Sequence, residues 1–145
     1  MRDPEPFAEL SATSVTEGEP SRAVVEQPPL PELDNHAGVR HAGALFAVGY
    51  AASRALVDAA LGGVSGAPRA RMVDSEVAYE KMVSAERVTA TAEPTGNDWD
   101  ALLERAAAGE SVQLPTTVTL RDEKGRTVTA MAVCWQVGPD DGQGR

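Results

Sequence analysis

The longest apolar run of the chain covers residues 42–61, and only Arg54 and Asp58 are charged within it. Apolar residues lie on nearly every face of a helix drawn through this run, which predicts a helix buried inside the protein. Gly62 and Gly63 follow it, as glycines commonly follow a helix terminus. The run is also long enough to suggest a membrane span, but the two charged residues interrupt it, and we therefore expect a core helix.

Shorter stretches on both sides of this run alternate between apolar and polar residues, the period of two that is typical of β-strands. One stretch precedes the helix, at residues 23–27, and stops at two prolines. Four stretches follow the helix, at about residues 72–81, 86–92, 112–122 and 126–137. The pattern therefore predicts five strands.

The connections between these strands have their own signals. A turn at about Ser84 is expected to join the strands at 72–81 and 86–92. Residues 122–125, with Gly125 where a positive φ is needed, predict a hairpin turn between the last two strands. In the strand at 72–81 the alternation places its acidic residues on the solvent side.

A second, shorter helix is predicted at residues 99–108, between the strand pairs. Trp99, Leu102, Leu103 and Ala106 share one face of it. Asn97 or Asp98 is a suitable cap before it, and Gly109 ends it.

This order of elements predicts an α+β fold, in which strands joined by hairpins form an antiparallel sheet that covers the long helix. Five strands leave one side of so apolar a helix incompletely covered, so we expect a homodimer. The domain should span residues 22–138. Residues 1–21 form an N-terminal extension that is partly flexible, with one helical turn at 3–10, and residues 139–145 form a polar tail.

Length and composition narrow the possible functions. With 145 residues, 42% hydrophobic and 24% charged, the chain suits one globular domain. The net charge of -9 argues against nucleic-acid binding, which depends on Lys and Arg. The N-terminus does not resemble a signal peptide, so we expect a cytoplasmic protein that does not enter the membrane. Cys134, the single cysteine, permits no internal disulfide and no cysteine metal cluster.

Four motifs in a fixed order resemble one known family. The first is N-x-x-G-x-x-H-A-G-A-L-F, from Asn35 to Phe46, at the entry to the long helix. The others are V-A-Y-E-K-M at residues 77–82, the strand at 86–92, and the hairpin at 118–130. Together they resemble the hotdog fold, specifically its thioesterase-like branch related to the phenylacetate-pathway thioesterases, and they span about residues 24–137.

This resemblance implies a hotdog fold, an antiparallel sheet wrapped around a long central helix, with the short helix between strands as an addition. It also implies a homodimer or homotetramer, with two sites at the dimer interface. The implied substrates are small acyl thioesters of coenzyme A or of an acyl carrier. The backbone N–H groups at the start of the helix would stabilise the oxyanion, and here Ala42, Gly43 and Ala44 occupy that place.

The carboxylate that this family uses is missing from its usual place. Thioesterases of the branch carry Asp or Glu about two turns into the helix, as general base or nucleophile. The matching positions here are Gly49 and Tyr50. The first acidic residue after His41 is Asp58, about four turns and roughly 20 Å from the oxyanion end.

Four residues remain candidates for the site, and each has a structural alternative. His41 could be the base, because its ordinary pKa of about 6.5 suits proton transfer, or it caps the helix or packs in the loop. Asn35 could orient a carbonyl or a water, or it satisfies loop backbone groups. Gly43 would provide the oxyanion donor. Tyr50 could donate a hydrogen bond to a ligand, or it fills space and closes the acyl tunnel.

No metal or cofactor is expected, because two histidines without a nearby carboxylate make a poor metal site. Two functions therefore remain open. The first is a thioesterase-like enzyme that acts on a small acyl thioester, with Gly43 as oxyanion donor and His41 or Asn35 assisting. The alternative is a repurposed hotdog dimer that binds, isomerises or cyclises a hydrophobic small molecule without hydrolysis, using Tyr50 as a polar contact.

Overall fold

The computed structural model describes residues 14–19, 21–62 and 68–138. The strands are β1 (Ser14–Glu19), β2 (Arg22–Gln27), β3 (Arg69–Tyr79), β4 (Val88–Pro94), β5 (Val112–Arg121) and β6 (Thr127–Gly138). The helices are the 3-10 turn η1 (Pro31–Leu33), the long α2 (Ala42–Leu61) and the short α3 (Trp99–Ala107). The helical turn expected at 3–10 and the polar tail at 139–145 lie outside the described residues.

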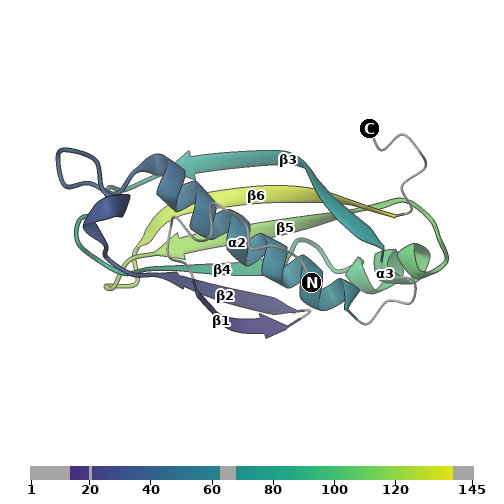
Figure 1. Cartoon of the computed structure of the whole chain (residues 1–145). Coiled ribbons are helices and arrows are strands. Elements are labelled where there is room, and N and C mark those ends of the chain that lie inside the picture. The colour runs from purple at the N-terminus through teal and green to yellow at the C-terminus, as the bar shows by residue number, and fades with distance from the viewer. Residues whose placement is uncertain (1–13, 20, 63–67, 139–145) are drawn as a thin grey trace.

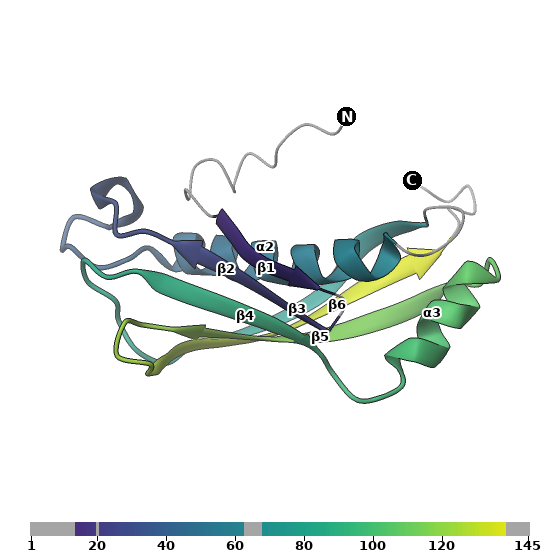
Figure 2. The ribbon, with the colours of Figure 1, turned by 90° about the horizontal axis from the view of Figure 1, so that it is seen from below.

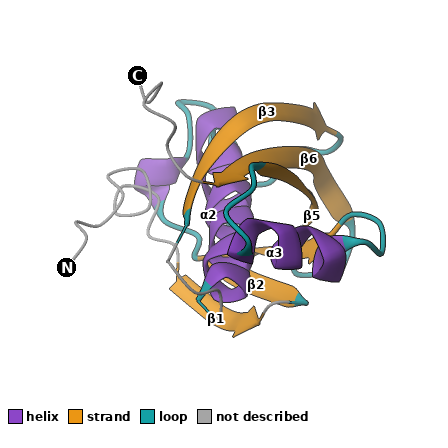
Figure 3. Ribbon diagram, turned by 90° about the vertical axis from the view of Figure 1, so that its right-hand side faces the viewer, coloured by secondary structure: helices purple, strands orange, loops and turns teal. Residues whose placement is uncertain are grey.

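The strands form one antiparallel sheet in the order β1-β2-β4-β5-β6-β3. The sheet curves, and α2 lies along its concave side (Figure 1). Figure 2 shows the helix and the sheet as two layers, and Figure 3, along the helix, shows the strands wrapping around α2 from β1 to β3. The predicted α+β arrangement of a sheet around a central helix, with one more short helix between strands, is confirmed.

The structure adds one strand to the five that the pattern predicts. β1 pairs with β2 along residues 14–19, inside the stretch that we assigned to the N-terminal extension. The sheet therefore begins before residue 22. The segment SVTEGE has no apolar alternation, because an edge strand needs only backbone pairing on one side.

The expected pairing of the strands at 72–81 and 86–92 through a turn at Ser84 is wrong. β3 pairs with β6 at one edge of the sheet, whereas β4 lies between β2 and β5. The residues between β3 and β4 therefore run from the β3 edge of the sheet, past β6 and β5, to the position of β4. Arg40 N donates to the carbonyl of Val83 in this crossover, at 2.8 Å, and thereby joins it to the start of α2.

Strand β3 is an edge strand with a bulge between Met72 and Asp74. The acidic residues of this strand are exposed, as the alternation predicted. The bulge changes the faces of its first half, so Val73 is exposed and Met72 is half-buried. The exposed large apolar side chains among the described residues are all in or just after this strand: Val73, Tyr79 and Met82.

The hydrophobic core lies between α2 and the sheet, with Leu45, Val48, Leu56 and Val57 on the covered side of the helix. By length and composition α2 could cross a membrane, but 56% of its most apolar window is buried inside the fold. Its apolar character is explained by this burial. The helix contacts β1, β2, β4 and β5 more extensively than β6 and β3, which leaves its other side, facing the β3 edge, less covered.

The hairpin between β5 and β6 forms as predicted. Asp122 Oδ1 accepts the backbone N–H groups of Lys124 and Arg126, each at 2.9 Å, and its Oδ2 lies 2.9 Å from the guanidinium of Arg126. Gly125 has a φ of 81°. Burial acts to raise the pKa of the Asp122 carboxyl. These hydrogen bonds and the charge of Arg126 outweigh burial and leave this pKa below its ordinary value.

Candidate functional site

The start of α2 presents free backbone donors. His41 is the N-terminal cap residue, and its carbonyl accepts the N–H groups of Ala44 and Leu45 at 3.0 and 3.1 Å. The preceding N–H groups, of Ala42 and Gly43, have no hydrogen-bond partner among the described residues. Both residues are exposed. Two donors at the positive end of a 20-residue helix therefore face the surroundings.

The surroundings of these donors are open within the chain. A Cβ atom added at Gly43 would meet no atom within 4 Å. The side chain of His41 is exposed and makes no capping hydrogen bond, so the alternative that its side chain caps the helix is not supported. Tyr79, at the end of β3, donates to the carbonyl of Ala42 at 3.3 Å. Desolvation beside the helix raises the pKa of this hydroxyl, which stays a donor at neutral pH.

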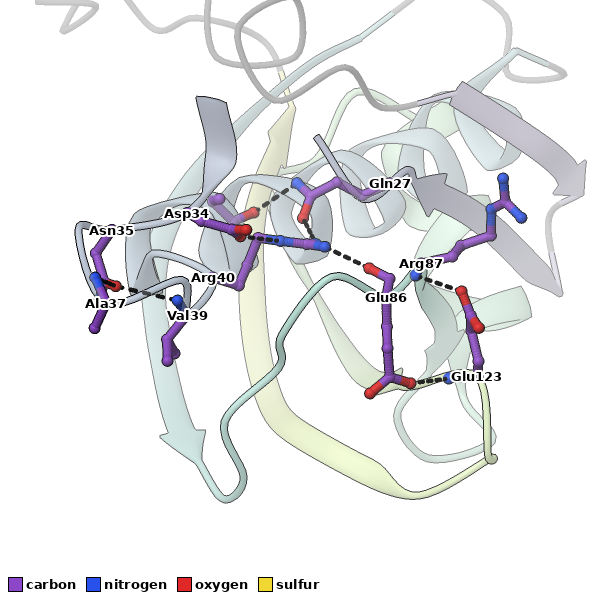
Figure 4. Close-up of polar contacts among 10 residues, drawn as sticks. Gln27, Asp34, Asn35, Ala37, Val39, Arg40, Glu86, Arg87 and Glu123 are labelled. Atoms are coloured by element: carbon purple, nitrogen blue, oxygen red, sulfur yellow. Dashed lines mark hydrogen bonds and ion pairs between the residues drawn. The ribbon is translucent and has the colours of Figure 1, made fainter. Parts of the chain in front are cut away.

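A buried arginine, Arg40, holds this helix start in place (Figure 4). Its guanidinium donates to Gln27 Oε1 at 2.7 Å, to Asp34 Oδ1 at 3.3 Å and to the carbonyl of Glu86. Gln27 in turn donates to the carbonyl of Ala44 at 2.9 Å. One cation thus joins β2, the loop before the helix and the β3–β4 crossover, and through Gln27 it also reaches the first turn of α2.

Asn35 shapes the loop that leads to this helix. Its Oδ1 accepts the backbone N–H groups of Ala37 and Val39 at 2.9 and 3.1 Å, and its own N–H donates to the carbonyl of Val39 at 2.7 Å. The side-chain oxygen therefore satisfies backbone groups, the structural role that we weighed for it. The side-chain amide N–H₂ has no partner among the described residues and remains able to donate.

Tyr50 lies two turns further along α2, on its less covered side. Its hydroxyl accepts a hydrogen bond from Arg54 Nη1 at 3.0 Å, and its ring lies 5.6 Å from that of Trp135 on β6. The guanidinium of Arg54 also lies over the Trp135 ring, at 5.7 Å, and 3.5 Å from Asp58. Tyr50 is therefore one part of a polar and aromatic cluster. It is half-buried.

The Trp135 ring is fixed from below by a buried chain of hydrogen bonds. Trp135 Nε1–H donates to Ser53 Oγ at 2.7 Å, and Ser53 Oγ lies 2.7 Å from Thr116 Oγ1. Thr116 donates its own proton to the carbonyl of Val133 at 2.9 Å. Because that proton is used, Ser53 must be the donor to Thr116, so the direction of the whole chain is determined.

Three of the four candidates lie in the loop before α2 or at the start of this helix, and the fourth lies further along it. Asn35, His41 and Gly43 belong to the loop and first turn of α2, but Tyr50 is seven residues beyond Gly43, about 10 Å along the helix axis. Gly49, the other position that replaces the family carboxylate, faces the core, since a Cβ there would lie 2.1 Å from Met131 Sδ. Tyr50 is the less buried of the two positions.

Sequence reasoning missed Arg40 and the Ser53–Trp135 chain. Arg40 is a loop cation in a stretch that also holds Asp34, which was the only local signal for a buried ion pair. Ser53 and Trp135 are 82 residues apart and carry no local signal. Across the described ranges, no three His, Cys, Asp or Glu side chains are grouped so that they could hold a metal ion.

Comparisons with known proteins place this geometry in a family. The model of the domain of unknown function DUF4442 matches residues 5–137. Among curated protein sequences no significant match is found.

Solved structures of similar fold cover most of both chains. AziG from S. sahachiroi is 22% identical, with a TM-score of 0.74 over 91% of this chain and 95% of its own. An asparagine-to-aspartate variant of the phenylacetic acid degradation protein PaaI from Thermus thermophilus is 19% identical, with a TM-score of 0.71 over 91% and 98%.

A hypothetical thioesterase from Streptococcus pneumoniae, solved with coenzyme A, is 16% identical, with a TM-score of 0.67 over 86% and 84%. These likenesses establish the fold that the four motifs suggested. The chain belongs to the DUF4442 family, and it has the hotdog fold.

Proposed function

We propose that this protein is a thioesterase-like enzyme that acts on a small acyl thioester of coenzyme A or of an acyl carrier. The observation that carries the proposal is the open start of α2, where the N–H groups of Ala42 and Gly43 have no partner among the described residues. Similar structures described as thioesterases, one of them holding coenzyme A, support the substrate class.

The helix start has the right chemistry for the first step of thioester hydrolysis. A water attacks the thioester carbon, the carbonyl oxygen becomes an oxyanion, and the two free N–H groups stabilise it together with the helix dipole. His41 takes the proton that the water loses. The C–S bond then breaks, and the thiolate takes up a proton, so that a free acid and a free thiol are released.

The same site lacks the carboxylate that would make this reaction fast. No Asp or Glu occurs between His41 and Asp58, and the less buried of the two matching positions is Tyr50, whose hydroxyl is hydrogen-bonded to Arg54. A positioned base contributes about 10²–10⁴-fold to such a step. We therefore expect slow hydrolysis that depends on His41.

We also propose that the active form is a homodimer or homotetramer built through β3. This strand is 11 residues long, is an edge of the sheet, and carries the exposed Val73 and Tyr79. Gly43 and Tyr50 are too far apart along one helix for a single small acyl group to touch both. A second copy would let a ligand lie between the helix start of one subunit and Tyr50 of the other. A cytoplasmic location stays a prediction.

Hydrolysis of short and aromatic acyl-coenzyme A esters tests the enzyme proposal. The natural protein should release coenzyme A slowly, and His41→Ala should lower the rate by about 10²-fold or more. His36→Ala is the matched control, because His36 is exposed in the same loop and should leave the rate unchanged. Fast hydrolysis that His41→Ala does not affect would overturn this assignment of the base.

A second variant tests the oxyanion donors. Gly43→Val should abolish turnover, because a β-branched side chain blocks approach to the backbone N–H groups. The fold should tolerate the change, since the space around the added Cβ is open within the chain. Unchanged turnover in this variant would place the site elsewhere.

One observation favours the alternative function. Replacement of the family carboxylate by the Tyr50–Arg54 pair removes a base and adds hydrogen-bond donors, which suits a dimer that binds, isomerises or cyclises a hydrophobic small molecule. Tight binding of a ligand without a thioester, with no hydrolysis of any ester, would favour this function over the first.

A further inference from the structure

Where α2 packs against β6, four side chains form a group that the thioester chemistry does not use. Tyr50 and Arg54 are half-buried on α2, Trp135 is buried on β6, and Ser53 lies beneath them in the core. A hydrogen bond, a ring contact, a cation–ring contact and the buried hydrogen-bond chain join these side chains.

We propose that Tyr50 and Arg54, held on the Trp135 ring, form a specificity site for an acyl group that carries an oxygen hydrogen-bond acceptor. This inference rests on the proposed thioesterase function and names the substrate class of that site. The acceptor would be a keto oxygen or a carboxylate, distinct from the thioester carbonyl at the helix start.

The first argument is the direction of the Tyr50 hydroxyl. A phenolic hydroxyl has one proton, and its oxygen here accepts the N–H of Arg54. Its own proton must therefore point away from Arg54, and it has no acceptor among the described residues. A donated hydrogen bond from a cation also polarises the O–H, which makes Tyr50 a stronger donor.

The second argument is that the pair is fixed before any ligand binds. The Trp135 indole is held by Ser53 at 2.7 Å, and Ser53 is held by Thr116, so the ring cannot rotate without leaving buried polar groups unpaired. Tyr50 and Arg54 both rest on this ring. A donor that is already oriented loses less entropy on binding than a free side chain does.

The third argument is the cost of an apolar ligand at the same place. A purely hydrocarbon acyl chain would cover the Tyr50 hydroxyl and take its proton out of water without an acceptor. A buried donor left unpaired costs about 1–3 kcal/mol. Sites built to hydrogen-bond a substrate group reject the analogue that lacks it more strongly than apolar pockets reject an extra methylene.

Three coenzyme A esters of equal chain length test this inference by calorimetric titration. Butyryl-coenzyme A has no second oxygen, acetoacetyl-coenzyme A has a neutral keto oxygen, and succinyl-coenzyme A has a carboxylate. We expect at least one of the two oxygenated esters to bind ten-fold or more tightly than butyryl-coenzyme A. A preference for the keto ester would identify a carbonyl acceptor, and a preference for the succinyl ester would identify a carboxylate.

Variants assign the preference to the cluster. Tyr50→Phe should remove it and leave the affinity for butyryl-coenzyme A unchanged or improved. Arg54→Met should reduce it, with the larger effect on the succinyl ester. Ser53→Ala, a change in a positioning residue, should lower the preference and shift the fluorescence of Trp135 in a Trp99→Phe background, whereas Ser84→Ala, an exposed serine of the crossover, should do neither.

The outcomes separate this inference from the function on which it rests. Equal binding of the three esters, or a preference that survives in Tyr50→Phe, would overturn the specificity site and leave the thioesterase proposal standing. Failure of all three esters to bind would overturn both. Because binding is measured directly, a slow or absent hydrolysis step does not affect the result.

Discussion

Two arginines near the central helix have different roles. Arg40 lies just before α2 with its side chain fully buried, and three acceptors surround its guanidinium. Arg54 lies on the less covered side with 20% of its side chain exposed, and it touches Tyr50 and Trp135. Arg40 therefore serves the fold, whereas Arg54 supports the Tyr50 hydroxyl, whose proton points away from Arg54.

Residue type alone therefore does not identify a functional group in this protein. Glycines show the same contrast. A Cβ atom at Gly49 would collide with Met131 in the core, whereas a Cβ atom at Gly43, beside the free backbone donors, would meet no atom within 4 Å. Arg40 and Gly49 are enclosed by the fold, whereas Gly43 and Tyr50 have hydrogen-bond donors left for a ligand.

The largest effect is expected from removing Arg40. Arg40→Met should lower the free energy of unfolding by about 3–5 kcal/mol, because it leaves Asp34 and the buried oxygen of Gln27 without their partner. Arg54→Met, the matched change, should cost about 1 kcal/mol or less, as expected for a partly exposed pair. Chemical denaturation at a fixed protein concentration measures both. Similar losses in the two variants would remove the distinction between the two arginines.

The glycine pair gives the next largest effect. Gly49→Ala should destabilise the protein by about 1–3 kcal/mol, because the new Cβ would lie 2.1 Å from Met131 Sδ in a buried position. Gly43→Ala should leave stability unchanged or slightly raised, since its Cβ meets nothing within 4 Å. Thermal melts of the two variants check this. A larger loss at Gly43 than at Gly49 would contradict the assigned sides of the helix.

The smallest effect on stability is expected from Asp122, whose ion pair with Arg126 lies within the β5–β6 hairpin. Its pKa is lower in the folded protein than its ordinary value of 3.8, so folding favours the ionised form. This contribution is fully present above about pH 4 and is lost as the pH falls through the lowered pKa. Asp122→Asn should therefore melt at a lower temperature than the natural protein near neutral pH, and the difference should shrink in acid. A difference that grows in acid would show the opposite sign.

The sequence predicted the helices and strands better than it predicted which strands pair with each other. The apolar run at 42–61 and the alternating strands follow from burial, which is a local property of the pattern. The position of β3 at the edge, away from β4, depends on pairing with β6 some sixty residues later, and a short gap at Ser84 looked like a hairpin. β1 was missed because its polar residues carry no burial signal.

The candidate site was predicted as far as motifs could reach. The N-x-x-G-x-x-H motif located the helix start, and the departure from the family pattern singled out Tyr50. The partners of Tyr50 could not be predicted, because Trp135 comes from a strand 85 residues away in the chain. Two roles were open for Asn35, a substrate contact or the support of loop backbone groups. Its Oδ1 accepts two backbone N–H groups of the loop, which fits the second role.

On the proposed function, the start of α2 still stabilises an oxyanion, while Tyr50 occupies the position at which related thioesterases carry a base. The most direct test compares release of coenzyme A from butyryl-coenzyme A by the natural protein and by Tyr50→Asp. The account predicts slow release by the natural protein and an increase of about 10²-fold or more when the carboxylate is introduced. Fast release by the natural protein that Tyr50→Asp does not increase would contradict it.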